Sequence, residues 1–342
     1  MRRLAVLMGG RSSEHEVSLA SARAVIAALD PDRYEVLPIM IGRDGGWSLA
    51  GESVALVPGA DGRGLIASLA GGPARAVDVV FPALHGPFGE DGTVQGLCES
   101  AGVAYVGAGV AASAMAMDKA IFRDLCRVAG LPAPETTVVV ADRWARERDA
   151  VRAEIAERPG YPAFAKPARL GSSVGISRVP DAGALDAALA LAFAHDPKAL
   201  VERAVSGREV EVGVLGNRDP MVSPPGEVTY DSDWYDYETK YEPGRMRLVV
   251  PAALPNGVAE RARELARRAF ELVGCSGMAR VDFFVEPDGT VLVSELNTIP
   301  GFTPTSVYAR LFEAAGIAYP AVVDRLVALA LEAAEERAGY RF

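Results

Sequence analysis

Three oxygen-bearing side chains interrupt two apolar segments near the end of the chain, in VDFFVEPDGTVLVSELNTIPG at residues 281–301. The segments flank a turn and are typical of a buried hairpin, yet they contain Asp282, Glu295 and Asn297. Alternate residues of a strand share a face, so Glu295 and Asn297 point the same way. Two carboxylates and an amide carbonyl form an all-oxygen ligand set that suits Mg²⁺ or Mn²⁺, and the lack of His and Cys disfavours zinc.

The turn decides whether Asp282 lies on that face as well. A two-residue loop at Pro287-Asp288 pairs Asp282 with Val293 and brings the three oxygen-bearing side chains together. A three-residue loop with Gly289 as a bulge reverses the parity. The pattern alone also leaves open an exposed hairpin face whose charges point to water.

A glycine-rich segment, AKPARLGSSVG at residues 165–175, has the composition of a phosphate-binding loop. Backbone N–H groups of such a loop can surround phosphate oxygens, while Lys166 at the end of the preceding strand supplies a compact charge. Only four residues of the chain are Lys, and Lys119 is a second one at the end of a predicted element. The segment is not a Walker A sequence, GxGxxG does not occur, and a flexible surface loop is the alternative interpretation.

The composition narrows the class of protein. The chain has 342 residues, half of them apolar, and a net charge of -10 without a basic stripe, so nucleic acid is not an expected partner. No apolar stretch reaches the roughly 20 residues that a membrane span needs, so no membrane is expected either. Three widely spaced Cys in no CxxC pair argue against a disulfide framework and favour a reducing cytoplasm.

Strand and helix patterns alternate along the first third of the chain, which predicts an α/β fold with a parallel sheet. The segments GGRSSE and HGPFGEDG then lie at the carboxyl edge of that sheet, where such folds bind ligands. We expect three domains: an α/β domain at 1–115, a small domain with the glycine-rich loop at 116–206, and a third, rich in strands and carrying the hairpin, at 207–342. One helix is expected over residues 112–130.

Together these segments resemble the ATP-grasp ligases, and among them the D-alanine–D-alanine ligases. The resemblance runs in order along nearly the whole chain, and eight segments carry it: GGRSSEHEVSL, LHGPFGEDGTVQG, MDK, KPARLGSSVGISRV, VERAVSGREVEVGVLG, YDYETKY, RVDFF and ELNTIPGFTPTS. It implies an ATP-grasp fold preceded by a parallel-sheet domain, with ATP between the second and third domains.

The resemblance also implies a set of site residues. Two Mg²⁺ or Mn²⁺ ions would be bound by Asp282, Glu295 and Asn297. ATP would be contacted by Lys119, Lys166, Ser173, Glu202, Val205 and Glu209. The catalytic residues would be Glu14, Ser172, Tyr241, Arg280 and Gly301, with Arg280 and the Gly301 backbone stabilising an oxyanion. The substrates would be contacted by Glu14, His85, Lys240, Tyr241 and Ser306.

The reaction that the resemblance implies is the ATP-dependent joining of two D-alanines through a D-alanyl phosphate, for peptidoglycan precursors, by a homodimer. Glu14, in the first turn of a helix, would bind the ammonium of the first substrate, although compensation of the helix dipole is an alternative role. His85 is equally well explained as a structural hydrogen bonder. Tyr241 favours an amine as acceptor, since relatives that make D-alanyl–D-lactate have His in this loop.

Two alternatives stay open from the sequence. The closer one is an ATP-grasp ligase with another acceptor, such as D-serine, D-lactate or a D-amino-acid analogue. The other is a non-catalytic nucleotide-binding relative, which the loss of Arg280 or of one metal ligand would signal; all of these residues are present.

Overall fold

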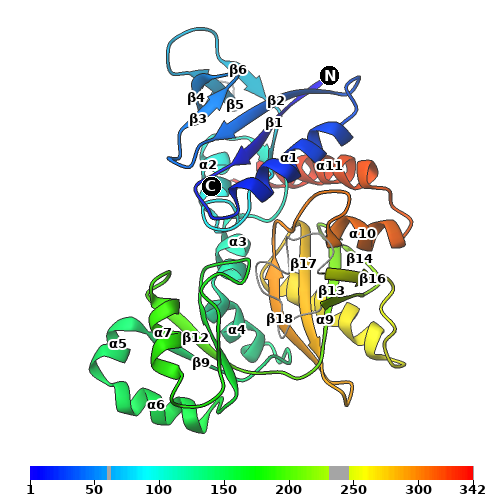
Figure 1. The fold of residues 1–342 in the computed structure, drawn as a ribbon. Coiled ribbons are helices and arrows are strands. Elements are labelled where there is room, and N and C mark those ends of the chain that lie inside the picture. Colours follow the sequence, from blue (N-terminus) through cyan, green and yellow to red (C-terminus); the bar gives the residue numbers. More distant parts are fainter. Residues whose placement is uncertain (60–62, 231–245, 342) are drawn as a thin grey trace.

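The computed structural model describes residues 1–59, 63–230 and 246–341, and these residues contain three sheets of eight, four and six strands. Figure 1 shows the first sheet at one end of the molecule and the other two side by side at the opposite end. The predicted boundaries at 115 and 206 fall between the sheets along the sequence, and the division into domains stays a prediction.

The first sheet is only half parallel. Its order is β6-β5-β4-β3-β2-β1-β7-β8, in which β2, β1, β7 and β8 are parallel and β2 to β6 are antiparallel. The predicted parallel sheet is therefore confirmed for one half, whereas the extension over residues 47–77 was not predicted. The strands are β1 (Arg2–Gly9), β2 (Tyr34–Ile41), β3 (Trp47–Leu49), β4 (Glu52–Pro58), β5 (Gly64–Ser68), β6 (Arg75–Val77), β7 (Val79–Pro82) and β8 (Ala104–Tyr105).

Both faces of β1 are buried, as expected of a central parallel strand. On one face Leu4 and Val6 pack with helices α1 (His15–Ala28) and α11 (Tyr319–Ala338). On the other face Ala5 and Leu7 pack in a separate cluster with α2 (Thr93–Ser100). The C-terminal helix thus returns to the first sheet, where Figure 1 shows α11 beside α1.

The helix expected over residues 112–130 is two helices, α3 (Val110–Met117) and α4 (Lys119–Val128). They are separated by Asp118, whose backbone is extended. Its carboxylate caps α4 by accepting hydrogen bonds from the N–H groups of Ala120 and Ile121, and it also pairs with Lys198 at 2.5 Å. Because Asp favours the N-cap over a helix interior, the segment begins a new helix here.

The second sheet is antiparallel in the order β11-β10-β12-β9, and helices α5, α6 and α7 pack on it. Its elements are β9 (Thr136–Val140), α5 (Ala141–Arg146), α6 (Arg148–Glu157), β10 (Ala163–Pro167), β11 (Ser177–Val179), α7 (Leu185–Phe193) and β12 (Lys198–Arg203).

The third sheet is antiparallel in the order β16-β15-β13-β17-β18, with β14 paired to β13. Its elements are β13 (Arg208–Gly216), β14 (Met221–Val222), β15 (Gly226–Tyr230), β16 (Met246–Val249), α9 (Val258–Leu272), β17 (Gly277–Val285), β18 (Val291–Asn297) and α10 (Val307–Ala314).

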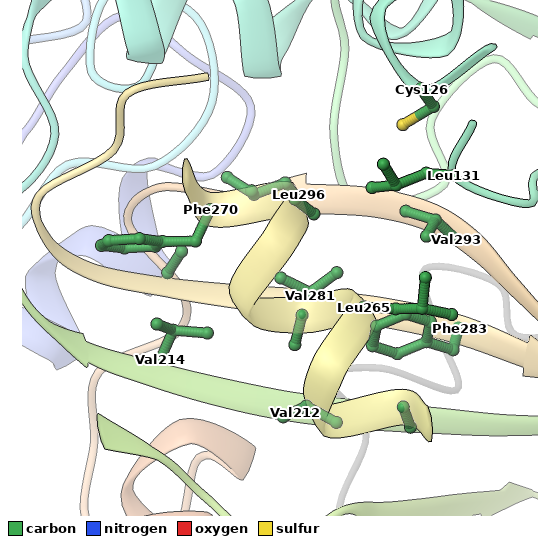
Figure 2. Packing of buried hydrophobic residues seen from close by; sticks show 14 of the residues in the cluster. Cys126, Leu131, Val212, Val214, Leu265, Phe270, Val281, Phe283, Val293 and Leu296 are labelled. Atoms are coloured by element: carbon green, nitrogen blue, oxygen red, sulfur yellow. The ribbon is translucent and has the colours of Figure 1, made fainter. Parts of the chain in front are cut away.

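Helix α9 covers one face of this sheet. Figure 2 shows Leu265 and Phe270 of α9 beside Val281 and Phe283 of β17. Since side chains alternate along a strand, Asp282, which lies between Val281 and Phe283, faces away from α9. The sheet therefore offers a second face for polar side chains.

Within the described residues, no single helix is long and apolar enough to cross a membrane, and only the bent pair α10 and α11 passes that test together.

Candidate active site

Asp282 lies directly opposite Glu295 in the hairpin of β17 and β18, and Arg280 lies opposite Asn297. Of the two loops that the sequence leaves open, the three-residue one is present, so Asp282 does not pair with Val293. The loop has three residues, closed by a hydrogen bond from Glu286 N to Thr290 O of 2.9 Å, with Gly289 at a φ of +88° that glycine adopts without strain.

A bulge at Ser294 changes, for a second time, the face of the sheet to which the following side chains point. Phe283 pairs with Val293, whereas the neighbouring Asp282 pairs with Glu295, so Ser294 is the extra residue. As a result Val293 and Leu296 both join the core beneath α9, while Glu295 and Asn297 point to the face of Asp282. The expected convergence is present, although by a different register.

Arg280 lies between two carboxylates on this face. Its guanidinium donates two hydrogen bonds of 2.7 Å to Asp282 and pairs with Glu211 of β13 at 2.8 Å. Burial disfavours the charged guanidinium, but Asp282 and Glu211 outweigh burial and raise the pKa of Arg280 well above its ordinary value. Arg280 is therefore a permanent cation beside the metal-ligand candidates.

Lys119 connects this face to the glycine-rich segment, whereas Lys166 joins two strands of the second sheet. The Lys119 ammonium lies 3.5 Å from Glu295 and donates a 2.8 Å hydrogen bond to the carbonyl of Leu170 in the glycine-rich segment. The Lys166 ammonium donates a 2.7 Å hydrogen bond to Glu202 of β12. Burial lowers the pKa of Lys166, although the neighbouring Glu202 opposes this shift.

The glycine-rich loop contacts Glu14 at the start of α1. The hydroxyl of Ser172 donates a hydrogen bond to Glu14, and a side chain at Gly171 would meet the same carboxylate at 3.2 Å. Ser172 and Ser173 have positive φ angles of 52° and 59°, which turn this loop tightly. Glu14 is the N-cap residue of α1 rather than a residue of its first turn.

His85 has both ring nitrogens in hydrogen bonds within the protein. Nδ1 lies 3.0 Å from the carbonyl of Ile299, which can only accept, so Nε2 accepts from the hydroxyl of Ser21 at 2.8 Å. Burial lowers the pKa of His85 and favours this neutral form. The arrangement accounts for His85 as a structural link between the first sheet and the segment that follows β18.

Four of the remaining predicted residues lie in the described part of the chain: Val205, Glu209, Gly301 and Ser306. Val205 follows β12, and Glu209 of β13 accepts a 2.7 Å hydrogen bond from Tyr230. Ser306 is the N-cap of α10 and accepts from the N–H of Thr303, while a side chain at Gly301 would lie 3.3 Å from its hydroxyl. Lys240 and Tyr241 lie outside the described residues.

The donor set of the hairpin suits a hard divalent cation. Two carboxylates oppose each other, and the Asn297 amide lies 3.1 Å from Asp282, within reach of a shared ion. All three supply oxygen ligands, which is the chemistry that Mg²⁺ and Mn²⁺ prefer. In the described part of the chain no group of three or more His, Cys, Asp or Glu side chains is placed to hold a metal.

Three charged residues of the site were not predicted. Glu211 and Arg123 lie in segments that hold other charged residues as well, so the sequence does not single either of them out. Glu90 accepts hydrogen bonds from the N–H groups of Gly86 and Ile299 at 2.7 and 3.0 Å. Its position inside HGPFGEDG, a segment expected at the carboxyl edge of the first sheet, was the one feature of the sequence that could have indicated a place in the site.

The glycine-rich loop of one antiparallel sheet and the carboxylate hairpin of the next are joined through Lys119, and this arrangement defines the class of ATP-grasp ligases. Solved structures agree with that class. The D-alanine–D-alanine ligase of Coxiella burnetii superposes with a TM-score of 0.86 at 34% identity, over 98% of this chain and 96% of that chain. A D-Ala:D-Ser ligase of Enterococcus faecalis superposes with a TM-score of 0.85 at 35% identity, over 96% of this chain and 99% of that chain.

The family models described as D-ala D-ala ligase N-terminus and C-terminus match residues 3–108 and 125–328. The D-alanine–D-alanine ligase of Deinococcus radiodurans is 50% identical over 97% of this chain and 99% of its own length. That of Geobacillus kaustophilus is 42% identical over 98% of this chain and 96% of its own length. The chain belongs to the D-alanine–D-alanine ligase family.

Proposed function

We propose that the protein joins two D-alanines to D-alanyl-D-alanine at the expense of ATP, for the synthesis of peptidoglycan precursors. The observation that carries this proposal is the position of Lys119, which contacts both the glycine-rich segment and Glu295 of the hairpin. A nucleotide whose phosphates lie between these two elements would meet cations on one side and metal ligands on the other.

The first step transfers the γ-phosphoryl group of ATP to the carboxylate of the first D-alanine, giving D-alanyl phosphate and ADP. Asp282, Glu295 and Asn297 would hold two Mg²⁺ or Mn²⁺ ions, which neutralise phosphate charge when bound. Lys119 and Lys166 would add positive charge, and Glu209 and the segment from Glu202 to Val205 would orient the nucleoside. Phosphoryl transfer depends mostly on such positioning and charge neutralisation.

In the second step, the amine of the second D-alanine attacks the acyl carbon, the bond to phosphate breaks, and the amine loses a proton. Arg280 and the backbone of Gly301 would stabilise the oxyanion of the tetrahedral intermediate. Ser306, at the N-terminus of α10, would bind the carboxylate of the second substrate together with Lys240. Glu14, Ser172 and Tyr241 would close the site and carry the proton.

Closure protects the acyl phosphate from water. The hydrogen bond between Ser172 and Glu14 supports this role, because it joins the phosphate loop to the first-substrate end of the site. We further propose that the enzyme acts in the cytoplasm as a homodimer.

The test is phosphate release from ATP and Mg²⁺ with D-alanine, D-serine and D-lactate offered singly and in pairs, with products identified by mass. We expect release with D-alanine alone and the dipeptide as product. Release only with a mixed pair would mean that the second substrate is D-serine or D-lactate rather than D-alanine. Absence of release with every pair, in protein that binds ATP, would contradict ligation.

A further inference from the structure

The bulge at Ser294 is bound from outside the hairpin by one side chain of the preceding domain. β18 is the edge strand of its sheet, so its outer backbone groups need partners from elsewhere. Arg123 of α4 donates hydrogen bonds to the carbonyls of Val293 at 2.6 Å and of Ser294 at 3.0 Å. In a regular strand, successive carbonyls point to opposite sides; the bulge lets one guanidinium reach both.

The same guanidinium also reaches the nucleotide side of the second sheet. Its second terminal nitrogen donates a 2.5 Å hydrogen bond to Glu202 of β12, whose other oxygen accepts from Lys166 at 2.7 Å. Arg123 is 7% exposed and Glu202 is 4% exposed, so this pair is shielded from water. Charge-assisted bonds from a planar, forked donor fix both distance and angle.

We propose that Arg123 is a positioning residue that sets the bulge of β18 against Glu202, and so fixes Glu295 relative to the nucleotide-binding segment. This inference rests on the proposed function for its nucleotide. Three acceptors on two sheets share one rigid cation, so a shift of either sheet breaks at least one of these bonds. No other described residue donates a side-chain hydrogen bond to the carbonyls of Val293 and Ser294.

The surroundings of Arg123 make truncation informative. On its other side lies a cavity of about 430 Å³, lined also by Asp124 and Arg127 of α4 and by the segment that follows the helix. Removing the guanidinium would connect this cavity to the bulge and give water access to its carbonyls. Arg127 lies one turn further along α4, is exposed and pairs with Asp124, which makes it a matched control.

The experiment compares the wild-type protein with Arg123→Met, Arg123→Lys and Arg127→Met. Hydrogen exchange of the amides of residues 293–297, measured without nucleotide or metal, should accelerate at least about tenfold in Arg123→Met and be unchanged in Arg127→Met. The affinity for ADP with Mg²⁺ should fall about 10-fold in Arg123→Met. Arg123→Lys keeps the charge beside Glu202 but lacks the forked guanidinium. It should therefore retain most of the wild-type ADP affinity but only part of the protection of residues 293–297 against hydrogen exchange.

Wild-type exchange at residues 293–297 in both Arg123 variants would overturn the proposal, as would equal acceleration in Arg127→Met. If Arg123→Met does not fold, Arg123→Lys alone tests the proposal. Hydrogen exchange of residues 293–297 at the wild-type rate in Arg123→Lys would contradict a role for the forked guanidinium. A wild-type protein that fails to bind ADP would contradict the proposed function instead, while the exchange measurement would still test the contact.

Discussion

Asp282 and Glu295 lie directly opposite each other because two irregularities of the hairpin cancel. The three-residue loop closed by Glu286 and Thr290 shifts the register by one residue, and the bulge at Ser294 shifts it once more. Since a one-residue slip turns every side chain to the other face, either irregularity alone would send Glu295 into the core beneath α9.

Insertion of one alanine between Ser294 and Glu295 should disrupt the proposed metal-ligand face. With one more residue in the strand, Glu295 either turns toward the core or moves two positions along to lie opposite Arg280, and in both cases it leaves its place opposite Asp282. We expect a loss of ligase activity of at least about 100-fold, because charge stabilisation by a metal contributes several kcal/mol. Ser294→Ala, which keeps the residue count, should retain activity. Equal activity of the insertion variant and Ser294→Ala in the phosphate-release assay would contradict the role of this register.

Glu211→Gln tests whether Arg280 is held from both sides. Glu211 is 4% exposed and lies 2.8 Å from Arg280, so the variant leaves the guanidinium with Asp282 as its one charged neighbour at that distance among the described residues. We expect kcat to fall about 10-fold. The free energy of unfolding, measured in urea, should fall by about 2 kcal/mol, since a charge-assisted bond inside the protein is weakened. An unchanged kcat would mean that Asp282 alone orients Arg280.

Ser172→Ala removes the contact between the glycine-rich loop and Glu14. The loop would still form, but it would be held less firmly against Glu14 at the start of α1, so more acyl phosphate should be lost to water. We expect kcat for dipeptide to fall about 10-fold, with ATP hydrolysed in excess of dipeptide formed. Ser13→Ala changes an exposed serine next to Glu14 and serves as the control. Tight coupling of ATP use to product in Ser172→Ala would contradict this role.

The carboxyl of Glu90 should make stability fall as the pH rises. Burial, and then the nearby Glu14 carboxylate, raise the pKa of Glu90 to about 8, although the N–H groups of Gly86 and Ile299 oppose the shift. A carboxyl whose pKa is raised on folding stabilises the protein below its unfolded pKa, and this stabilisation is lost as the pH rises through the folded pKa.

Between pH 6 and pH 9, the free energy of unfolding of the wild-type protein should therefore fall by about 2 kcal/mol more than that of Glu90→Gln. Thermal and urea unfolding of both proteins at the two pH values provide the comparison. Parallel pH profiles would show that Glu90 is already ionised at pH 6.

Much of this architecture could be predicted from the sequence, because apolar periodicity and motif order carry it. The ligand face of the hairpin was predicted from the alternation of Glu295 and Asn297, but its register was not, since nothing in VLVSELN marks Ser294 as a bulge. The carbonyl of Val293 beside that bulge accepts a hydrogen bond from Arg123, which lies 170 residues earlier along the chain.

Other features escaped prediction for a similar reason. Asp118 divides a continuous helical pattern because its capping bonds and its pair with Lys198 compete with the helix interior. Glu211 is one of three charged residues in REVEVGVLG, and only pairing with β17 places it beside Arg280. Tertiary contacts decide such positions.

We propose that Asp282, Glu295 and Asn297 hold the divalent ions that ligation requires. The most direct measurement is a Mn²⁺ titration followed by electron paramagnetic resonance, with a non-hydrolysable ATP analogue bound, in wild-type protein and in Glu295→Gln. We predict two ions per chain in the wild-type protein and at least one fewer, or about a 100-fold weaker one, in Glu295→Gln. The same number of ions, bound with the same affinity in both proteins, would show that Glu295 is not a metal ligand.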